Sequence, residues 1–107
     1  MDYLEFIETK IFSHTRKEMM TDDEFWEFQS YLLENYERGN TISQTGGCKK
    51  IRWQRRGTGK QGGLRVIYHA LPAHGRLYLL LIYPKNVKDD LSSQERTVLR
   101  SLSQKLN

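Results

Sequence analysis

One apolar run in the second half of the chain limits the possible folds more than any other feature. Residues 77–83 read Leu-Tyr-Leu-Leu-Leu-Ile-Tyr, and no charged residue, glycine or proline interrupts them. A short, almost continuously apolar segment is typical of a strand that is buried on both faces. Pro84 follows directly and is expected to end the strand, because proline has no backbone N–H to donate. We therefore expect this run to be the central strand of a sheet.

Two earlier segments carry the patterns of strands. After a Gly-Gly pair at 46–47, residues 50–53 alternate basic and apolar side chains, which places Trp53 in the core. Residues 64–71 are rich in β-branched and aromatic side chains, which also predicts a strand. The glycine-rich stretch 57–63 is expected to be a loop between them, and Pro72 to Gly75 a hairpin turn before the apolar run. Residues 3–7 predict a further short strand.

Three helices are predicted around these strands. Residues 8–20 indicate a modest helix. Thr21 and Glu24 have the spacing of a capping box, so a second helix should begin there and end near Gly39. Ser92 and Glu95 repeat this spacing and predict a last helix. The residues expected on the apolar faces of the second and last helices are Phe25, Phe28, Leu32, Tyr36, Val98, Leu99, Leu102 and Leu106.

The order β-α-α-β-β-β-α predicts an α+β fold: a small antiparallel sheet with two N-terminal helices packed on it and a C-terminal helix, all on one face. A chain of 107 residues has the length of one domain, residues 1–107. No apolar run approaches the roughly 18 residues of a membrane span, and the first residues do not resemble a signal peptide. The single cysteine, Cys48, cannot form an internal disulfide. These features predict a cytoplasmic protein with no membrane partner.

Charge is divided unevenly along the chain. Residues 1–45 carry four basic residues against ten acidic ones, a net charge of −6, and residues 46–107 carry thirteen against three, a net charge of +10. No carboxylate occurs between Glu37 and Asp89. Basic residues without interspersed acids attract polyanions, because each neutralised phosphate releases condensed counterions. The aromatic residues among them favour a nucleic acid as partner, although the same charges could instead pair with the acidic half of the chain.

The sequence offers few groups for metal or nucleotide chemistry. Zinc sites need cysteine and histidine at close spacings, but Cys48 is alone and the three histidines are far apart or lie in a turn. Magnesium nucleases need grouped carboxylates, whereas Asp89 and Asp90 precede a helix and are expected to interact with its dipole. Residues 57–63 lack the Walker form and are followed by a strand. We expect no metal and no cofactor.

Metal-free cleavage of RNA is the chemistry that the basic half could carry out. RNA supplies its own nucleophile, the 2′-hydroxyl, so an enzyme needs a base, cations for the developing oxyanion and a proton source for the leaving oxygen. Arginine and lysine supply the charge, and a tyrosine or lysine whose pKa is lowered by neighbouring cations can move the proton. Side chains of these types near strand ends are Lys50, Arg52, Lys60, Arg65, Tyr83 and Lys85.

These candidates have structural alternatives. Arg65 could be a solvated edge residue, Tyr83 a core aromatic residue and Lys85 a solvated lysine. His69 and His74 could form an acid–base pair, but a single histidine on a strand is more often structural. The residue patterns alone leave these alternatives open.

Five segments, in order and at compatible spacing, resemble one family. They are Thr45-Gly46-Gly47, Lys50-Ile51-Arg52, Gly59-Lys60-x-Gly62-Gly63-x-Arg65-Val66-Ile67-Tyr68, Leu79-Leu80-Leu81-Ile82-Tyr83-x-Lys85-Asn86 and Asp90-Leu91-Ser92. Together, over roughly residues 45–95, they resemble the HigB-like branch of the RelE superfamily of bacterial toxins. Residues 1–44 match only in layout, with two helices ahead of the sheet. The chain departs from the family pattern at Gln61, His69 and Val87.

The resemblance implies a RelE-like microbial RNase fold and the toxin of a type II toxin–antitoxin pair. Such toxins are ribosome-dependent endoribonucleases that cut mRNA in the ribosomal A site. A cognate antitoxin, typically of helix-turn-helix type, inhibits them, and the complex binds operator DNA. By matched position, Arg65 is implied to stabilise the transition state and Tyr83 to stack on or activate the cut nucleotide. Basic residues that lie where the family surrounds the scissile phosphate are Lys50, Arg52, Lys60 and Lys85.

We therefore expect two sets of site residues. The expected catalytic residues are Arg65, Tyr83, Lys60 and Lys85. The expected RNA-binding residues are Lys49, Lys50, Arg52, Arg55, Arg56 and Arg76. A non-catalytic nucleic-acid-binding module, or a basic subunit that docks on an acidic partner, would use the same charges but would leave mRNA intact.

Overall fold

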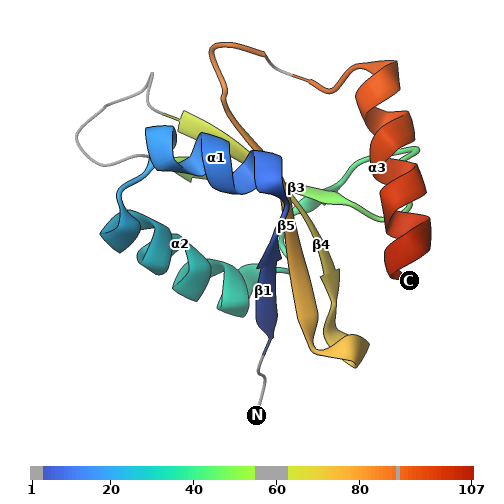
Figure 1. The fold of residues 1–107 in the computed structure, drawn as a ribbon, viewed down its shortest axis with the longest axis horizontal. Helices are drawn as coiled ribbons and strands as arrows, with labels where there is room; N and C mark the ends of the chain where they lie inside the picture. Colours follow the sequence, from blue (N-terminus) through green and yellow to red (C-terminus); the bar gives the residue numbers. More distant parts are fainter. Residues whose placement is uncertain (1–3, 55–62, 89) are drawn as a thin grey trace.

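The computed structural model describes residues 4–54, 63–88 and 90–107 of the chain. Its elements are β1 (Glu5–Glu8), α1 (Lys10–Met19), α2 (Asp22–Asn35), β2 (Asn40–Thr41), β3 (Lys49–Gln54), β4 (Gly63–Leu71), the 3-10 turn η2 (Pro72–His74), β5 (Arg76–Pro84) and α3 (Ser93–Leu106) (Figure 1). The predicted α+β class is confirmed. β2 is an additional strand that the sequence does not predict, because two polar residues carry no alternating pattern.

The strands form one mixed sheet in the order β1-β5-β4-β3-β2. β3, β4 and β5 pair antiparallel as predicted, and the additional strand β2 also pairs antiparallel with β3, but β1 lies parallel to β5. Helices rather than a hairpin follow β1, so no tight turn fixes its direction. The apolar run is an interior strand, but β4 and not β5 occupies the middle of the sheet. The reason is that only β1 lies beyond β5, whereas both β3 and β2 lie beyond β4.

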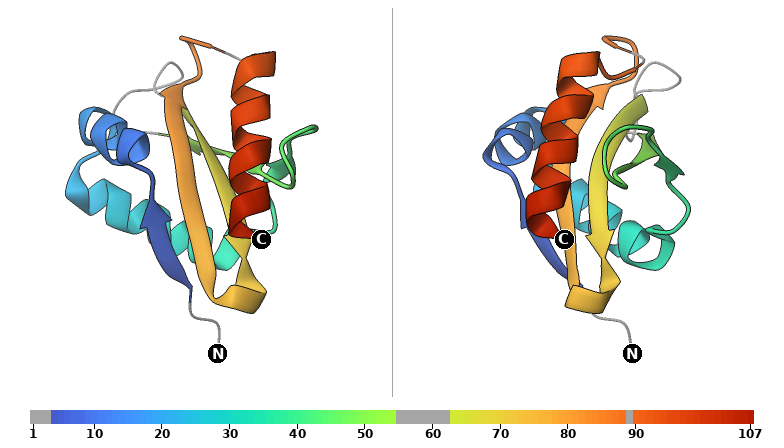
Figure 2. Two further views of the ribbon diagram at one scale, coloured as in Figure 1. Left: turned by 45° about the vertical axis from the view of Figure 1, so that its right-hand side comes forward. Right: turned by 90° about the vertical axis from the view of Figure 1, so that its right-hand side faces the viewer.

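Helices cover both faces of the sheet, so the prediction of a single covered face is wrong (Figure 2). On one face, Phe28 of α2 lies in a core with Val66 and Leu79. On the other, Leu99 of α3 lies in a second core with Leu80. Successive side chains of a strand point to opposite faces, so most neighbours in the apolar run enter different cores; Leu80 and Leu81, at the irregularity in the β4–β5 register, both face the α3 side. A strand with apolar side chains on both faces therefore needs helices packed on both faces of the sheet.

Side-chain caps set the beginnings of α1 and α2. Oγ1 of Thr9 accepts a hydrogen bond from the backbone N–H of Phe12 at 3.1 Å, so α1 begins at Lys10 and not at residue 8. The predicted cap at Thr21 is confirmed, because its Oγ1 accepts from the backbone N–H of Glu24 at 3.1 Å. Each cap satisfies a backbone donor that the helix itself leaves without a partner.

The capping box of α3 is confirmed in both directions. Oγ of Ser92 accepts from the backbone N–H of Glu95 at 3.1 Å, and the Glu95 carboxylate accepts from the backbone N–H of Ser92 at 2.8 Å. Leu99 is buried as predicted, but Val98 is 65% exposed. Adjacent helix positions point about 100° apart, so only part of the predicted apolar stripe meets the sheet. None of the helices among the described residues is both long and apolar enough to cross a bilayer.

The Thr45-Gly46-Gly47 segment joins β2 to β3 and is fastened to α3. Oγ1 of the fully buried Thr45 donates to the carbonyl oxygen of Ile42 at 2.7 Å, and the Thr45 carbonyl oxygen accepts from Oγ of Ser103 at 2.9 Å. Gly46 has a φ of +76°, and a Cβ at this position would lie 2.9 Å from Cβ of Ser103. Both the backbone angle and the close approach favour glycine. The motif therefore holds the start of β3 against α3.

Candidate active site

Strand pairing brings three of the predicted site residues into one row. Arg65 on β4 is the direct partner of Arg52 on β3 and also of Tyr83 on β5. Directly opposed residues in antiparallel strands point to the same face, with Cβ atoms about 5 Å apart. This row, Arg52–Arg65–Tyr83, lies on the face that α3 covers, because Tyr83 belongs to the core of that face.

A hollow of about 290 Å³ opens beside this row. Its lining residues are Arg38, Gly39, Asn40, Lys50, Ile51, Arg52 and Arg65. Lys50 is two residues before Arg52 on β3 and therefore points to the same face of the sheet. Four of the lining residues carry a positive charge, and none carries a negative one. The hollow therefore favours a bound anion.

Arg65 is the buried charge at the centre of the row. The residue is 7% exposed, and its Nε is buried with no hydrogen-bond partner in the described part of the chain. The ion pairs found between described residues involve neither Arg65 nor Arg52. Removing a guanidinium from water without a partner is unfavourable, whereas an oxyanion would accept short, charge-assisted hydrogen bonds from it. The position is suited to stabilising negative charge on phosphate oxygens.

Tyr83 is 8% exposed, and a lysine lies over its ring. Nζ of Lys88 is 5.1 Å from the ring centroid, within the range of a cation–π interaction. The same ammonium pairs with the carboxylate of Glu95 at the start of α3. Sequence analysis did not assign Lys88 to the site. Lys88 lies between β5 and α3, and its ion pair with Glu95 of α3 places it over the Tyr83 ring. No local sequence pattern predicts a contact of this kind.

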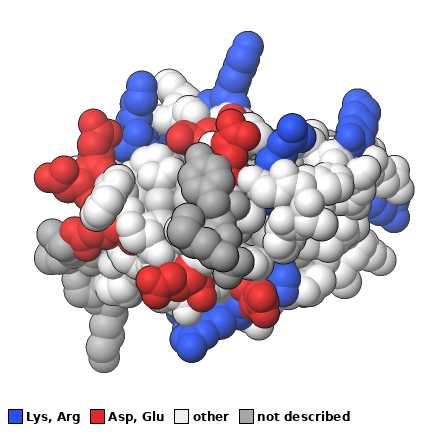
Figure 3. All heavy atoms as spheres, turned by 90° about the horizontal axis from the view of Figure 1, so that it is seen from below, with Lys and Arg blue, Asp and Glu red and all other residues white. Residues whose placement is uncertain are grey.

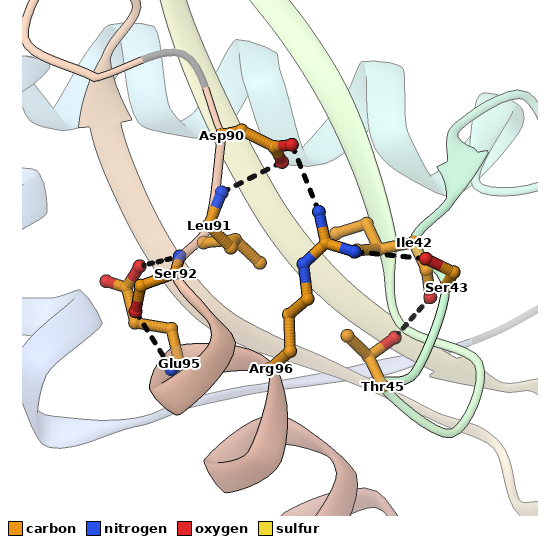
Figure 4. A network of polar contacts seen from close by, with 8 residues as sticks. All are labelled: Ile42, Ser43, Thr45, Asp90, Leu91, Ser92, Glu95 and Arg96. Carbon is orange, nitrogen blue, oxygen red and sulfur yellow. Dashed lines mark hydrogen bonds and ion pairs between the residues drawn. The ribbon is translucent and has the colours of Figure 1, made fainter.

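A polar network closes the side of the site between β2 and α3 (Figure 4). The guanidinium of Arg96 donates to the Asp90 carboxylate and to Oγ of Ser43, both at 3.0 Å. The backbone N–H of Leu91 donates to the same carboxylate at 2.8 Å. That hydrogen bond, together with the charges of Arg96 and Lys50, holds the pKa of Asp90 below its ordinary value. Asp90 thus remains negative and fixes the loop to α3.

A second hollow of about 240 Å³ lies against this network. Its lining residues are Asn40, Thr41, Ile42, Ser43, Lys50, Asp90 and Arg96. It shares Asn40 and Lys50 with the first hollow, so the two lie side by side near the β2 edge of the sheet. Arg38 and Arg96 therefore line the basic region although sequence analysis did not single them out as site residues.

Two of the predicted RNA-binding residues lie away from the row. Nζ of Lys49 donates to the carbonyl oxygens of Glu37 and Gly39, at 3.4 and 3.5 Å. Lys49 points to the α1–α2 face because it neighbours Lys50 on the same strand. Arg76 begins β5, opposite Leu71, whereas Tyr83 is seven positions further along. At about 3.3 Å per residue the two are roughly 23 Å apart, so the structure does not bring Arg76 to the site.

Lys85 lies beside the row, and three further candidates cannot be placed. Lys85 is exposed in the turn after β5, and its backbone N–H donates to the carbonyl oxygen of Gly63 at 3.0 Å. Its side chain therefore starts two residues beyond Tyr83. Arg55, Arg56 and Lys60 lie outside the described residues.

Other singled-out side chains have structural roles. Trp53 packs against Phe28, with ring centroids 5.3 Å apart, and its Nε1 donates to the Glu24 carboxylate at 3.0 Å. Nε2 of His69 lies 3.0 Å from Oδ1 of Asn107, and His69 is four residues along β4 from Arg65. The expectation that Trp53 lies in the core is confirmed.

Cys48 is a buried packing residue. Its Sγ lies 3.2 Å from Oγ of Ser103 in the core below α3. Burial raises the pKa of this thiol, which favours the unreactive protonated form. Within the described ranges, no three His, Cys, Asp or Glu side chains come together in a group that could hold a metal ion.

The uneven charge of the sequence is visible on the molecular surface. On the face shown in Figure 3, acidic side chains gather at the left and centre, on the side where α2 lies in Figure 1. Towards the right of the same view, where α3 lies in Figure 1, the coloured side chains are basic. One acid of the first half of the chain lies in α1 and five lie in α2, the helical layer opposite the Arg52–Arg65–Tyr83 row.

Comparison with protein families gives a match over almost the whole chain. A family model described as the RelE toxin of the RelE / RelB toxin–antitoxin system matches residues 6–107. The matched range includes the Arg52–Arg65–Tyr83 row and all three helices.

Proposed function

The chain belongs to the RelE toxin family, and from this premise we propose that it is a ribosome-dependent, metal-independent endoribonuclease. It is the toxin of a toxin–antitoxin system. In our proposal it enters the ribosomal A site and cuts the mRNA there, which makes it a cytoplasmic inhibitor of translation. The HigB-like branch of the family is part of the proposal, on the segment resemblance given above.

The direct pairing of Arg65 with both Arg52 and Tyr83 is the observation that carries this proposal. Two guanidinium groups and a phenol on one face of a sheet supply what metal-free phosphodiester cleavage needs. Arg65 has little exposure to water, which strengthens its interaction with developing negative charge. Lys50 extends the positive charge along the path that an RNA backbone would take beside the row.

The proposed reaction is an attack by the RNA on itself. The 2′-oxygen bonds to phosphorus as its proton passes to a base, and the bond from phosphorus to the 5′-oxygen breaks as that oxygen takes up a proton. The products are a 2′,3′-cyclic phosphate and a 5′-hydroxyl. Arg65 and Arg52 donate hydrogen bonds to the non-bridging oxygens, and the Tyr83 hydroxyl or a lysine, Lys85 or Lys60, moves a proton.

An antitoxin is the expected protein partner, because the family is defined by a toxin–antitoxin system. We propose a partner of helix-turn-helix type that inhibits the toxin and carries the complex to operator DNA. Growth arrest on expression of the chain alone, relieved by co-expression of the partner, would support this part of the proposal.

The test is a comparison of two arginine variants in translating extracts. Arg65→Met keeps the apolar stem but removes the guanidinium, and Arg100→Met removes an exposed arginine of α3 as a matched control. Loss of one such charge contact lowers rates by about 10²–10³ in comparable oxyanion sites. Primer extension should show codon-spaced breaks with wild-type protein and Arg100→Met, and almost none with Arg65→Met. Intact mRNA with folded wild-type protein, or undiminished cleavage by folded Arg65→Met, contradicts the proposal.

A further inference from the structure

We propose that Lys88 and Glu95 form a clamp that positions Tyr83 for the reaction. This inference rests on the proposed function. It concerns two residues that neither the sequence patterns nor the family match assigns to the site.

The first part of the clamp is the contact between Lys88 and Tyr83. Nζ of Lys88 lies over the Tyr83 ring, 5.1 Å from its centroid. An ammonium within about 6 Å of a ring centroid is attracted by the negative face of the π-system. Because Tyr83 is only 8% exposed, this cation has few alternative positions from which it could contact the ring. The interaction therefore restricts the orientation of the ring beside Arg65.

The second part is the carboxylate that fixes Lys88. One oxygen of Glu95 pairs with the Lys88 ammonium, and the other accepts from the backbone N–H of Ser92 at 2.8 Å. Oγ of Ser92 in turn accepts from the Glu95 backbone N–H at 3.1 Å. The hydrogen bonds from Lys88 and Ser92 keep the pKa of Glu95 below its ordinary value, so it is a carboxylate at neutral pH. A capped helix end thus determines the position of Lys88.

The clamp has a consequence for the role of Tyr83. While the Lys88 ammonium lies over the ring, a nucleobase cannot stack on that ring face. The hydroxyl oxygen of Tyr83 is itself buried. The clamp therefore fixes the position of the whole Tyr83 side chain on the strand that pairs with Arg65. Lys88 and Glu95 are positioning residues in this scheme.

The test measures single-turnover cleavage on ribosomes programmed with an mRNA, over a range of toxin concentrations. Lys88→Met keeps the length of the side chain but removes its charge, and Lys88→Arg keeps a cation that can lie over the ring. Lys105→Met removes an exposed lysine from the last turn of α3 and is the matched control. We expect Lys88→Met to lower the saturating rate about tenfold, the size of one partly buried cation–π contact. The toxin concentration that gives half of the saturating rate should stay within about twofold of the wild-type value, because the substitution does not affect binding.

Rescue by arginine separates positioning from a general loss of structure. Lys88→Arg should recover most of the saturating rate, and Lys105→Met should match the wild type. Wild-type saturating rates in Lys88→Met, or no recovery in a folded Lys88→Arg variant, would overturn the inference while leaving the proposed function intact.

A second measurement tests the clamp without any cleavage. In the wild type, the ring current of Tyr83 should shift the ε-methylene proton resonances of Lys88 upfield in an NMR spectrum. Glu95→Gln keeps an oxygen that can accept from Ser92 but removes the charge that holds Lys88, so the shift should largely disappear. Unshifted Lys88 resonances in the wild type, or the same shift in Glu95→Gln, would refute the clamp even if the protein cuts mRNA as proposed.

Discussion

At the scale of single residues, Tyr68 shows how one buried polar group ties two elements together. It is the largest fully buried side chain among the described residues, and its hydroxyl donates to the carbonyl oxygen of Tyr36 at 2.6 Å. Tyr36 follows the last turn of α2, so this bond joins that helix to the central strand β4. Gly39 passes so close that a Cβ there would collide with the hydroxyl. The backbone of Gly39 therefore packs directly against the Tyr68 hydroxyl group.

The raised pKa of Tyr68 should lower the free energy of unfolding at alkaline pH. Burial raises the pKa of this phenol from 10.0 to about 12. The unfolded chain then loses the proton at lower pH than the folded one, so the stability from this group is complete below about pH 10 and declines towards pH 12. Urea unfolding across this range should show a steeper loss for the wild type than for Tyr68→Phe. Equal pH slopes would contradict the assignment.

The same substitution should also lower stability at neutral pH. Tyr68→Phe removes the donor to the Tyr36 carbonyl oxygen, and a lost hydrogen bond of this kind contributes about 1 kcal/mol to the free energy of unfolding. Tyr78→Phe is a suitable control, because Tyr78 is only partly buried. The comparison at pH 7 needs only the midpoint and slope of each urea transition.

At the scale of elements, the connection between β2 and β3 determines how α3 sits on the sheet. Thr45 and Ser103 join the connection to the helix, and Gly46 allows the two backbones to approach. Arg52 and Lys50 follow on β3, so this contact also sets the distance between the basic strand and the helix that carries Glu95. The Thr45-Gly46-Gly47 motif is thus explained by packing and needs no direct role in chemistry.

Replacing Gly46 should separate backbone strain from collision. Gly46→Ala must adopt a left-handed conformation, which is unfavourable by about 1–2 kcal/mol, and its Cβ would also meet Ser103. Gly47 also has a positive φ, of +106°, but a Cβ there would lie no closer than 3.4 Å to its nearest neighbour, a ring carbon of His69, so Gly47→Ala carries the strain without the collision. We expect a clearly larger drop in thermal midpoint for Gly46→Ala. Equal drops would mean that the approach to α3 is easily relieved.

At the scale of the whole molecule, charge separation distinguishes the two faces. The row Arg52–Arg65–Tyr83 and Lys50 lie on the α3 face, whereas α1 and α2 cover the other face. Five of the ten acids of the first 45 residues occur within α2 alone, with two more at the ends of β1. A polyanion should therefore approach from the α3 side of the sheet.

Salt dependence of binding should report this separation. A single-stranded RNA with 2′-O-methyl groups throughout cannot cleave itself, so its Kd can be measured by fluorescence anisotropy at several salt concentrations. For single strands, each phosphate contact contributes about 0.7 to the slope of log K against log salt. Lys50→Gln with Arg52→Gln should flatten the slope by up to about 1.4. Lys10→Gln with Lys17→Gln, which lowers the net charge equally on α1, should leave it unchanged; equal slopes for the two double variants would contradict the assigned face.

The sequence by itself determined those features that depend on neighbouring residues. The capping spacing of Ser92 and Glu95 and the apolar run 77–83 predicted their elements correctly, because helix caps and strand burial are encoded within a few residues. The same holds for the concentration of basic residues after residue 45. The resemblance of short segments led to the family that the match over residues 6–107 confirms.

Only the tertiary structure decided which of those residues meet. Register between β3, β4 and β5 sets Arg65 between Arg52 and Tyr83, whereas Lys49, one position from Lys50, points to the opposite face. The direction of β1, the face that α3 covers and the position of Lys88 over Tyr83 likewise depend on partners far away in the chain. Local pattern fixes the period of an element, but pairing and packing between distant segments fix its neighbours.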